Sequence, residues 1–147
     1  MKQHILKKVP LFVTVSVLLA CIVFSGCAGR TVITDAQFKS ACEAADCEVT
    51  DVSDQFDSSV ITKALTVSGD DYSLGFFTFA STDSAKTNYA QMLSSVRTSE
   101  GKAVDSSEYN RYTYKGDDLT TVLYRNGTTI LFADKDTVNK VVTALGL

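Results

Sequence analysis

Apolar side chains recur at intervals of three and four residues in three segments, which is the spacing of one helix face. These segments are residues 35–45, 83–99 and 136–145. The first has the clearest start, because Thr34 can cap it and Gln37, three residues later, can return the hydrogen bond. Ile33 and Phe38 are placed to close over that cap. The pattern therefore predicts three helices.

Runs of β-branched and aromatic residues between these helices predict strands. The runs are residues 48–52, 60–68, 72–80, 108–115, 119–125 and 128–133. Gly69-Asp70-Asp71 joins one pair of runs as a hairpin, and Asn126-Gly127 joins another. Asn-Gly favours a type I′ turn, in which both central residues have positive φ. The run 72–80 carries phenylalanine on both faces, which indicates a central strand.

The order of elements is therefore α-β-β-β-α-β-β-β-α, with short connections. Such an order predicts an α+β domain built on a mainly antiparallel sheet of about five to six strands. We expect the helices to pack on one face of this sheet and leave the other face open. Residues 34–147 form this single domain.

The N-terminal segment has a different pattern. Lys2, Lys7 and Lys8 precede an apolar run from Val9 to Phe24, which closes on Phe24-Ser25-Gly26-Cys27. A basic start, an apolar stretch and small residues before a cleavage site are typical of a secretory signal peptide. An uncleaved transmembrane helix is the alternative, but 16 residues span only about 24 Å of a hydrocarbon core of roughly 30 Å.

Phe24-Ser25-Gly26-Cys27 resembles the lipobox of bacterial lipoproteins, in which Leu, a small residue and Gly or Ala precede Cys. The sequence departs from this pattern in having Phe24 where Leu is most common. The resemblance implies a diacylglyceryl group on the Cys27 thiol, cleavage before Cys27, and a protein held at the outer face of the cell membrane. Residues 1–26 would be the signal peptide and 27–33 the lipidated tether, as in small Gram-positive lipoproteins with a short α+β domain.

A second match to the lipobox ends at Cys21, in Leu18-Leu19-Ala20-Cys21. Cleavage there would leave Ile22-Val23-Phe24 exposed directly after the lipid, whereas Cys27 is followed by small and polar residues. Cys27 is therefore the expected lipidation site.

Composition excludes several functions. Without residues 1–26 the chain has 11 basic and 17 acidic residues, a net charge of −6. We therefore expect no nucleic-acid partner, because phosphate binding requires clustered Lys and Arg. The only histidine, His4, lies in the signal segment, so the mature chain cannot form a Ser-His-Asp triad or a His-ligated zinc site. The sequence predicts no metal site and no cofactor.

Cys42 and Cys47 remain as an even pair, and an oxidising location would permit a disulfide between them. There are three interpretations of this pair. In order of preference they are a local disulfide, two free buried thiols and a redox pair. The redox interpretation is last because the spacing is not Cys-x-x-Cys.

Tyr112 and Tyr114 lie on one face of a predicted strand, and Tyr124 on the next strand could join them. Such a patch on the open sheet face would suit a sugar, a peptide or a protein partner, because tyrosine combines stacking area with a polar tip. Ordinary cross-strand aromatic packing is the alternative, and the one that the composition of strands favours.

Other motifs fail on their spacing. Asp51, Asp54 and Asp57 lack the alternation and the glycine of a calcium-binding loop. Ser99-x-x-Lys102 stands without the partner motifs of penicillin-binding enzymes.

Three classes of function remain open. We expect first a non-catalytic binding or interaction module with an unknown protein or small-molecule partner, and not an enzyme. An accessory or modulator subunit of a membrane system is the alternative. A hydrolase is the least favoured, because it would need two carboxylates converging in a cleft.

Overall fold

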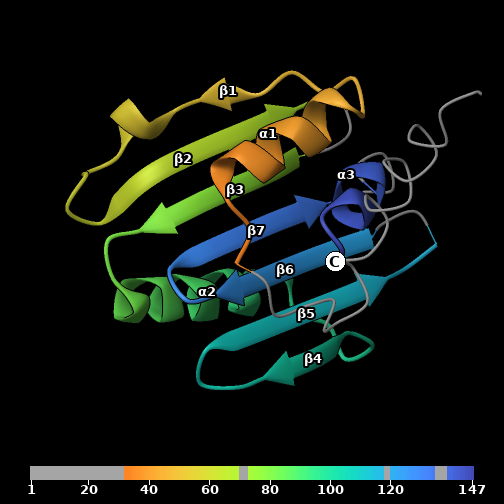
Figure 1. Cartoon of the computed structure of the whole chain (residues 1–147). Helices are drawn as coiled ribbons and strands as arrows, with labels where there is room; N and C mark the ends of the chain where they lie inside the picture. The colour runs from red at the N-terminus through yellow and green to blue at the C-terminus, as the bar shows by residue number, and fades with distance from the viewer. Residues whose placement is uncertain (1–31, 70–72, 118–119, 135–138) are drawn as a thin grey trace, which may run out of the picture.

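The computed structural model of the chain describes residues 32–69, 73–117, 120–134 and 139–147. One antiparallel sheet of seven strands is flanked by three α-helices, in an α+β arrangement (Figure 1). The strands lie side by side in the order β1-β2-β3-β7-β6-β5-β4. The strand bounds are β1 Thr50–Asp51, β2 Ile61–Ser68, β3 Ser73–Phe79, β4 Lys102–Asp105, β5 Tyr109–Lys115, β6 Thr120–Asn126 and β7 Thr129–Asp134. The helices are α1 Asp35–Glu43, α2 Thr82–Val96 and α3 Asn139–Ala144, with a short 3-10 helix, η1, at Ser53–Gln55.

The start of α1 is formed as its sequence predicts. The Thr34 hydroxyl accepts a hydrogen bond from the Gln37 amide at 3.2 Å. The Gln37 side chain accepts in return from the Thr34 amide at 2.9 Å. Ile33 and Phe38 are both buried beside this cap. The reciprocal pair gives hydrogen-bond partners to two backbone amide groups that have no acceptor within the helix.

The sheet has more strands than the five to six predicted, because the edge strand β4 was not predicted. All four residues of β4 are exposed, so its sequence has no alternation of apolar and polar residues from which a strand could be predicted. It is defined only by pairing with β5, in which Ala103 lies opposite Tyr112.

The prediction that the helices share one face is also wrong. One apolar cluster joins α1 and α3 to the face that carries Leu65, Phe76 and Leu131. A second cluster joins α2 to the opposite face, which carries Leu123 and Ile130. Figure 1 shows α1 and α3 in front of the sheet and α2 behind it. The sheet therefore lies between two helical layers.

The strand order explains the position of α2. Since neighbouring strands are all antiparallel, β3 and β4 run in the same direction, with β7, β6 and β5 between them. The chain from β3 through α2 to β4 is therefore a crossover between parallel strands. Such crossovers are right-handed in nearly all proteins, which fixes the face that the helix covers. The terminal helices α1 and α3 cover the other face.

The central strands bury side chains on both faces. Every residue of β6 is buried, and β3 lies between β2 and β7 as its sequence predicts. Phe76 stacks on Phe38 of α1 with ring centroids 5.2 Å apart. Phe77, the next residue, packs into the cluster beneath α2.

The hairpin between β6 and β7 is confirmed, but its turn is displaced by one residue. Asn126 pairs with Thr129, so Gly127 and Thr128 are the central residues. Gly127 has φ of 55°, whereas Thr128 has negative φ. Positive φ at the first central residue alone is the type II′ pattern rather than type I′. The Gly127 carbonyl also accepts a hydrogen bond from the Arg125 side chain at 3.1 Å.

Among the helices of the described residues, none is long and apolar enough to cross a membrane.

Candidate functional site

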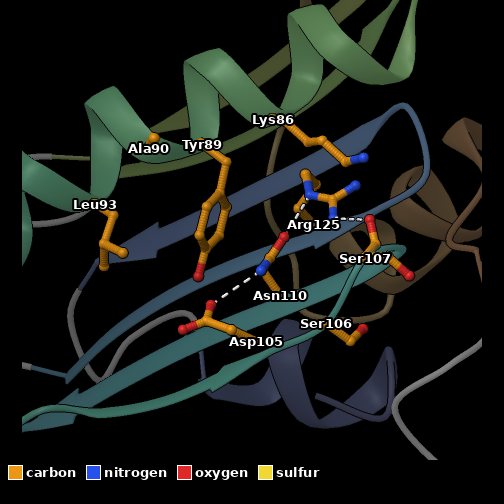
Figure 2. A pocket seen from close by; sticks show the side chains of 9 residues that line it. All are labelled: Lys86, Tyr89, Ala90, Leu93, Asp105, Ser106, Ser107, Asn110 and Arg125. Carbon is orange, nitrogen blue, oxygen red and sulfur yellow. Dashed lines mark hydrogen bonds between the residues drawn. The ribbon is translucent and has the colours of Figure 1, made fainter.

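A pocket of about 290 Å³ lies between α2 and the strands β4, β5 and β6 (Figure 2). Its roof is one stripe of α2, formed by Lys86, Tyr89, Ala90 and Leu93. These residues follow the i, i+3, i+4, i+7 rule, which aligns them along one helix face. The pocket volume is near the lower end of the range for small-molecule sites, roughly 300–1,000 Å³.

The floor of the pocket is a row of polar residues across three strands. Asp105 of β4 pairs with Asn110 of β5, and Asn110 pairs with Arg125 of β6. Residues directly opposite one another in a sheet point to the same face, so all three side chains face α2. Ser106 and Ser107, in the turn between β4 and β5, complete the lining.

Arg125 is fully buried, with no solvent-exposed surface. Its guanidinium donates to Asn110 Oδ1 at 2.6 Å, to the Ser107 carbonyl at 3.0 Å and to the Gly127 carbonyl at 3.1 Å. All three acceptors are neutral, and no carboxylate of the described residues forms an ion pair with this group. Burial lowers the pKa of Arg125, while the nearby charge of Glu108 acts to raise it. The floor therefore contains a fixed positive charge that hydrogen bonds hold in place but do not neutralise.

Asn110 connects this charge to a carboxylate. Its Oδ1 accepts from Arg125, and its Nδ2 donates to Asp105 Oδ1 at 2.9 Å. Arg125 and Asp105 stand two strands apart, about 10 Å between backbones. The floor therefore has positive charge at one end and negative charge at the other, with one amide group between them.

The hydroxyl of Tyr89 is the unusual group of the roof. Tyr89 is only 4% exposed, and its hydroxyl has no hydrogen-bond partner among the described residues. Figure 2 shows it pointing down toward Asn110 and Asp105. Burial raises the pKa of Tyr89, and the negative charge of Asp105 raises it further. A buried hydroxyl without a partner costs about 1–3 kcal/mol, so this position favours an occupant that can bind it.

The structure does not bring the three predicted tyrosines together. Tyr112 and Tyr114 lie on the face that α2 covers, whereas Tyr124 packs on the opposite face. Tyr112 and Tyr124 are both 0% exposed. The prediction of a tyrosine patch on an open sheet face is therefore wrong, because helices cover both faces. The Tyr112 hydroxyl instead accepts a hydrogen bond from the Thr98 amide at 2.9 Å.

Cys42 and Cys47 are free thiols at the end of α1, so the local disulfide that ranked first among the interpretations is not formed in this structure. The Cys47 amide donates to the Cys42 carbonyl at 2.9 Å, the Asp46 amide donates to Glu43, and Asp46 has φ of 56°. This is the Schellman motif, whose first and last residues commonly form an apolar contact. The spacing Cys42-x4-Cys47 is thus the spacing of that contact. Cys42 is buried. Its pKa is raised from 9.0 to about 11, mainly by burial and to a smaller extent by the nearby Cys47.

Asp51 at the end of β1 and Asp57 before β2 form local contacts. Asp51 accepts hydrogen bonds from Ser53 and pairs with Lys63, and Asp57 accepts from Ser59. In the part of the chain that the structure describes, no three metal-ligating side chains converge. Cys27, the predicted lipidation site, lies outside the described residues.

Sequence reasoning missed the pocket residues. Asn110 and Arg125 are polar residues within strands, a pattern usually produced by a solvent-exposed face. Lys86 and Ala90, beside Tyr89, are exposed residues at the margin of the α2 stripe. The signal in the sequence was the alignment of polar residues at cross-strand positions, which can be recognised only once the strand register is known.

No protein-family model matches the sequence, and no curated protein matches it. Among solved structures, the chain is similar to a GTP binding regulator from Thermotoga maritima, with 11% identity and a TM-score of 0.45 over 74% of this chain and 83% of that chain. A similarity at this level carries no argument about what this chain does.

Proposed function

We propose that the protein is a lipid-anchored lipoprotein of the extracytoplasmic face of the membrane, and that its domain is a non-catalytic binding module. The anchor is the lipobox-like segment that ends at Cys27, and the domain begins a few residues later at Thr34. Two or three acyl chains hold a protein stably at a bilayer, at about 0.8 kcal/mol per buried methylene. The ligand site is the pocket beneath α2.

The unpartnered hydroxyl of Tyr89 is the observation that carries the binding proposal. A roof residue that is buried without a hydrogen bond destabilises the empty domain, whereas a bound polar molecule would satisfy it. Arg125 below it is buried and hydrogen-bonded, but it forms no ion pair within the described residues, so an anionic group of a ligand would also stabilise the filled site. Tyr89 therefore lacks a hydrogen-bond partner, and Arg125 lacks a counter-charge.

The pocket is poorly suited to the chemistry of a carboxylate-dependent hydrolase. Asp105 is the one carboxylate among its lining residues. Glycosidase-type hydrolysis uses two, one as acid and one as base or nucleophile. A binding role is therefore the better explanation of the site.

An accessory subunit of a membrane system is the second proposal, favoured by the edge strand β4. Its residues are all exposed, and Val104 is 56% exposed. An unpaired edge of this kind can accept a strand from another protein. Cross-linking from a reactive group placed at residue 104 in intact cells would identify such a partner.

Lipid anchoring is tested by metabolic labelling with a radioactive or clickable fatty acid in a bacterial host. Cys27→Ala removes the thiol that would take the lipid, so we expect loss of label and a failure to cleave the signal peptide. Cys21→Ala is the matched control, since it removes the competing cysteine only, and it should label like the wild type. Label that persists in Cys27→Ala but disappears in Cys21→Ala would place the anchor at Cys21 instead.

Binding is tested on the full chain extracted in mild detergent, with saturation-transfer NMR against a library of small polar molecules. We expect at least one compound to bind the wild type and Tyr114→Phe, but not Tyr89→Phe. Tyr114 is a suitable control, because it lies on the same sheet face but outside the pocket lining. Compounds that bind Tyr89→Phe and Tyr114→Phe equally well would show that the pocket is not the binding site.

A further inference from the structure

The pocket beneath α2 contains charges of both signs, and their arrangement restricts what it can hold. Lys86 and Arg125 lie at one end, and Asp105 lies at the other, below the Tyr89 hydroxyl (Figure 2). A simple anion would meet Asp105, and a simple cation would meet Arg125. Like charges at such short range repel one another, so both arrangements are unfavourable.

The Asp105 end can receive a positively charged group. The Asp105 carboxylate accepts one hydrogen bond, from Asn110, and retains further acceptor sites. The Tyr89 oxygen beside it can also accept, and it has no partner of its own in the described chain. An ammonium group has three N–H donors, which matches this set of acceptors.

The other end can receive a carboxylate. Arg125 supplies a positive charge in the floor, fixed in place by its three hydrogen bonds. Lys86 is exposed at the rim above it, and its flexible stem can bring a second positive charge to the ligand.

The remaining wall is apolar and the volume is small. Ala90 and Leu93 form this wall, and the whole pocket is about 290 Å³. Asp105 and Lys86 are exposed side chains, and exposed side chains change rotamer within nanoseconds. Both side chains can therefore adjust their positions to a ligand that binds beside Tyr89.

We propose that this pocket binds a free amino acid with a short aliphatic side chain, as a zwitterion. Its ammonium group contacts Asp105 and the Tyr89 oxygen, and its carboxylate faces Lys86 and Arg125. Its side chain packs on Ala90 and Leu93. This proposal rests on the binding function proposed above and adds the class of ligand.

The test uses three probes that differ in one charged group each. L-Leucine carries both groups, 4-methylpentanoate lacks the ammonium group, and 3-methylbutylamine lacks the carboxylate. Dissociation constants are measured by calorimetry on the full chain in detergent. We expect L-leucine to bind at least tenfold more tightly than either analogue, since a hydrogen bond to a charged group is typically worth that factor or more.

Variants test which charged group of the ligand binds at each end of the pocket. Asp105→Asn keeps an acceptor for Asn110 but removes the charge, and it should weaken L-leucine at least tenfold while leaving 4-methylpentanoate unchanged or improved. Lys86→Gln should do the reverse, weakening the carboxylate probe and leaving 3-methylbutylamine unchanged. Tyr114→Phe should leave all three unchanged.

The outcomes separate this proposal from the one on which it rests. If an analogue binds as tightly as L-leucine, the pocket does not recognise both charges, and the amino acid proposal is overturned while binding stands. If none of the probes binds but library compounds lose affinity in Tyr89→Phe, the ligand class is wrong and the site is right. If neither the probes nor any library compound binds, both proposals fail.

Discussion

Two buried tyrosines on the α2 face differ in the partners of their hydroxyl groups. The Tyr112 hydroxyl bonds to the amide of Thr98 at 2.9 Å, whereas the Tyr89 hydroxyl has no partner in the described part of the chain. Tyr112→Phe should therefore lower the free energy of unfolding by about 1 kcal/mol, and Tyr89→Phe should leave it unchanged or raise it. Denaturant unfolding of the ligand-free protein measures both. A loss in Tyr89→Phe as large as in Tyr112→Phe would show that the Tyr89 hydroxyl has a partner.

Cys42 makes the stability of the domain depend on pH in the alkaline range. Burial raises the pKa of its thiol from 9.0 to about 11. Above pH 9 the unfolded chain loses this proton while the folded chain keeps it, so the stability present below pH 9 is lost as the pH rises toward 11. The loss is on the order of 2 kcal/mol. Cys42→Ala should have a lower free energy of unfolding at pH 8 but a shallower decrease from pH 9 to 11. Equal slopes in both proteins would contradict the assignment.

At the scale of single residues, the local contacts were more predictable than the site. The cap of α1 depends on residues three apart, Thr34 and Gln37, which the sequence shows directly. The pocket depends on Tyr89 and Arg125, which are 36 residues apart in the chain. Arg125 is buried because α2 crosses above it, and no local pattern contains that information.

At the scale of elements, the connection from α2 to β4 depends on the absence of a side chain at Gly101. A Cβ atom there would overlap the ring and hydroxyl of Tyr112, which is fully buried. Gly101→Ala should therefore lower the free energy of unfolding by about 1–3 kcal/mol, the usual cost of overpacking.

A double-mutant cycle tests the cause of that loss. With the ring removed in Tyr112→Ala, the further change Gly101→Ala should cost little, so the coupling between the two positions should account for most of the single-mutant effect. Losses that simply add would mean that the backbone at Gly101, and not the contact with Tyr112, requires glycine.

The strands could be predicted from the periodicity of apolar residues wherever at least one side of the strand is buried. The strands β2, β3, β5, β6 and β7 lie within one residue of their predicted bounds, since each carries alternating or continuous apolar residues. The strand β4 was missed because both of its sides face solvent. The face covered by α2 was predicted wrongly because it depends on the order of strands in the sheet, which periodicity does not determine.

At the scale of the whole molecule, the sheet should be protected from hydrogen exchange from its centre outward. The strands β3, β7 and β6 are central, and β6 is buried at every residue. The edges β1 and β4 have exposed side chains throughout. We expect amides of β3, β6 and β7 to exchange slowest, near the global free energy of unfolding, and those of β4 to exchange fastest. Strong protection along the whole of β4 in membranes, lost in detergent, would support a protein partner at that edge.

The position of β7 beside β3 also has a consequence for how the chain folds. Residues near Phe77 pair with residues near Ile130, although each of the other strand pairs joins neighbours in sequence. The hairpin β2–β3 and the meander from β4 to β7 can each form early from local contacts. The ladder between them closes a loop of more than fifty residues and is reached last, since long loops lose more chain entropy on closure. Until it closes, β3 and β7 each present an unpaired edge, so the interval before closure is when this chain is most prone to aggregate.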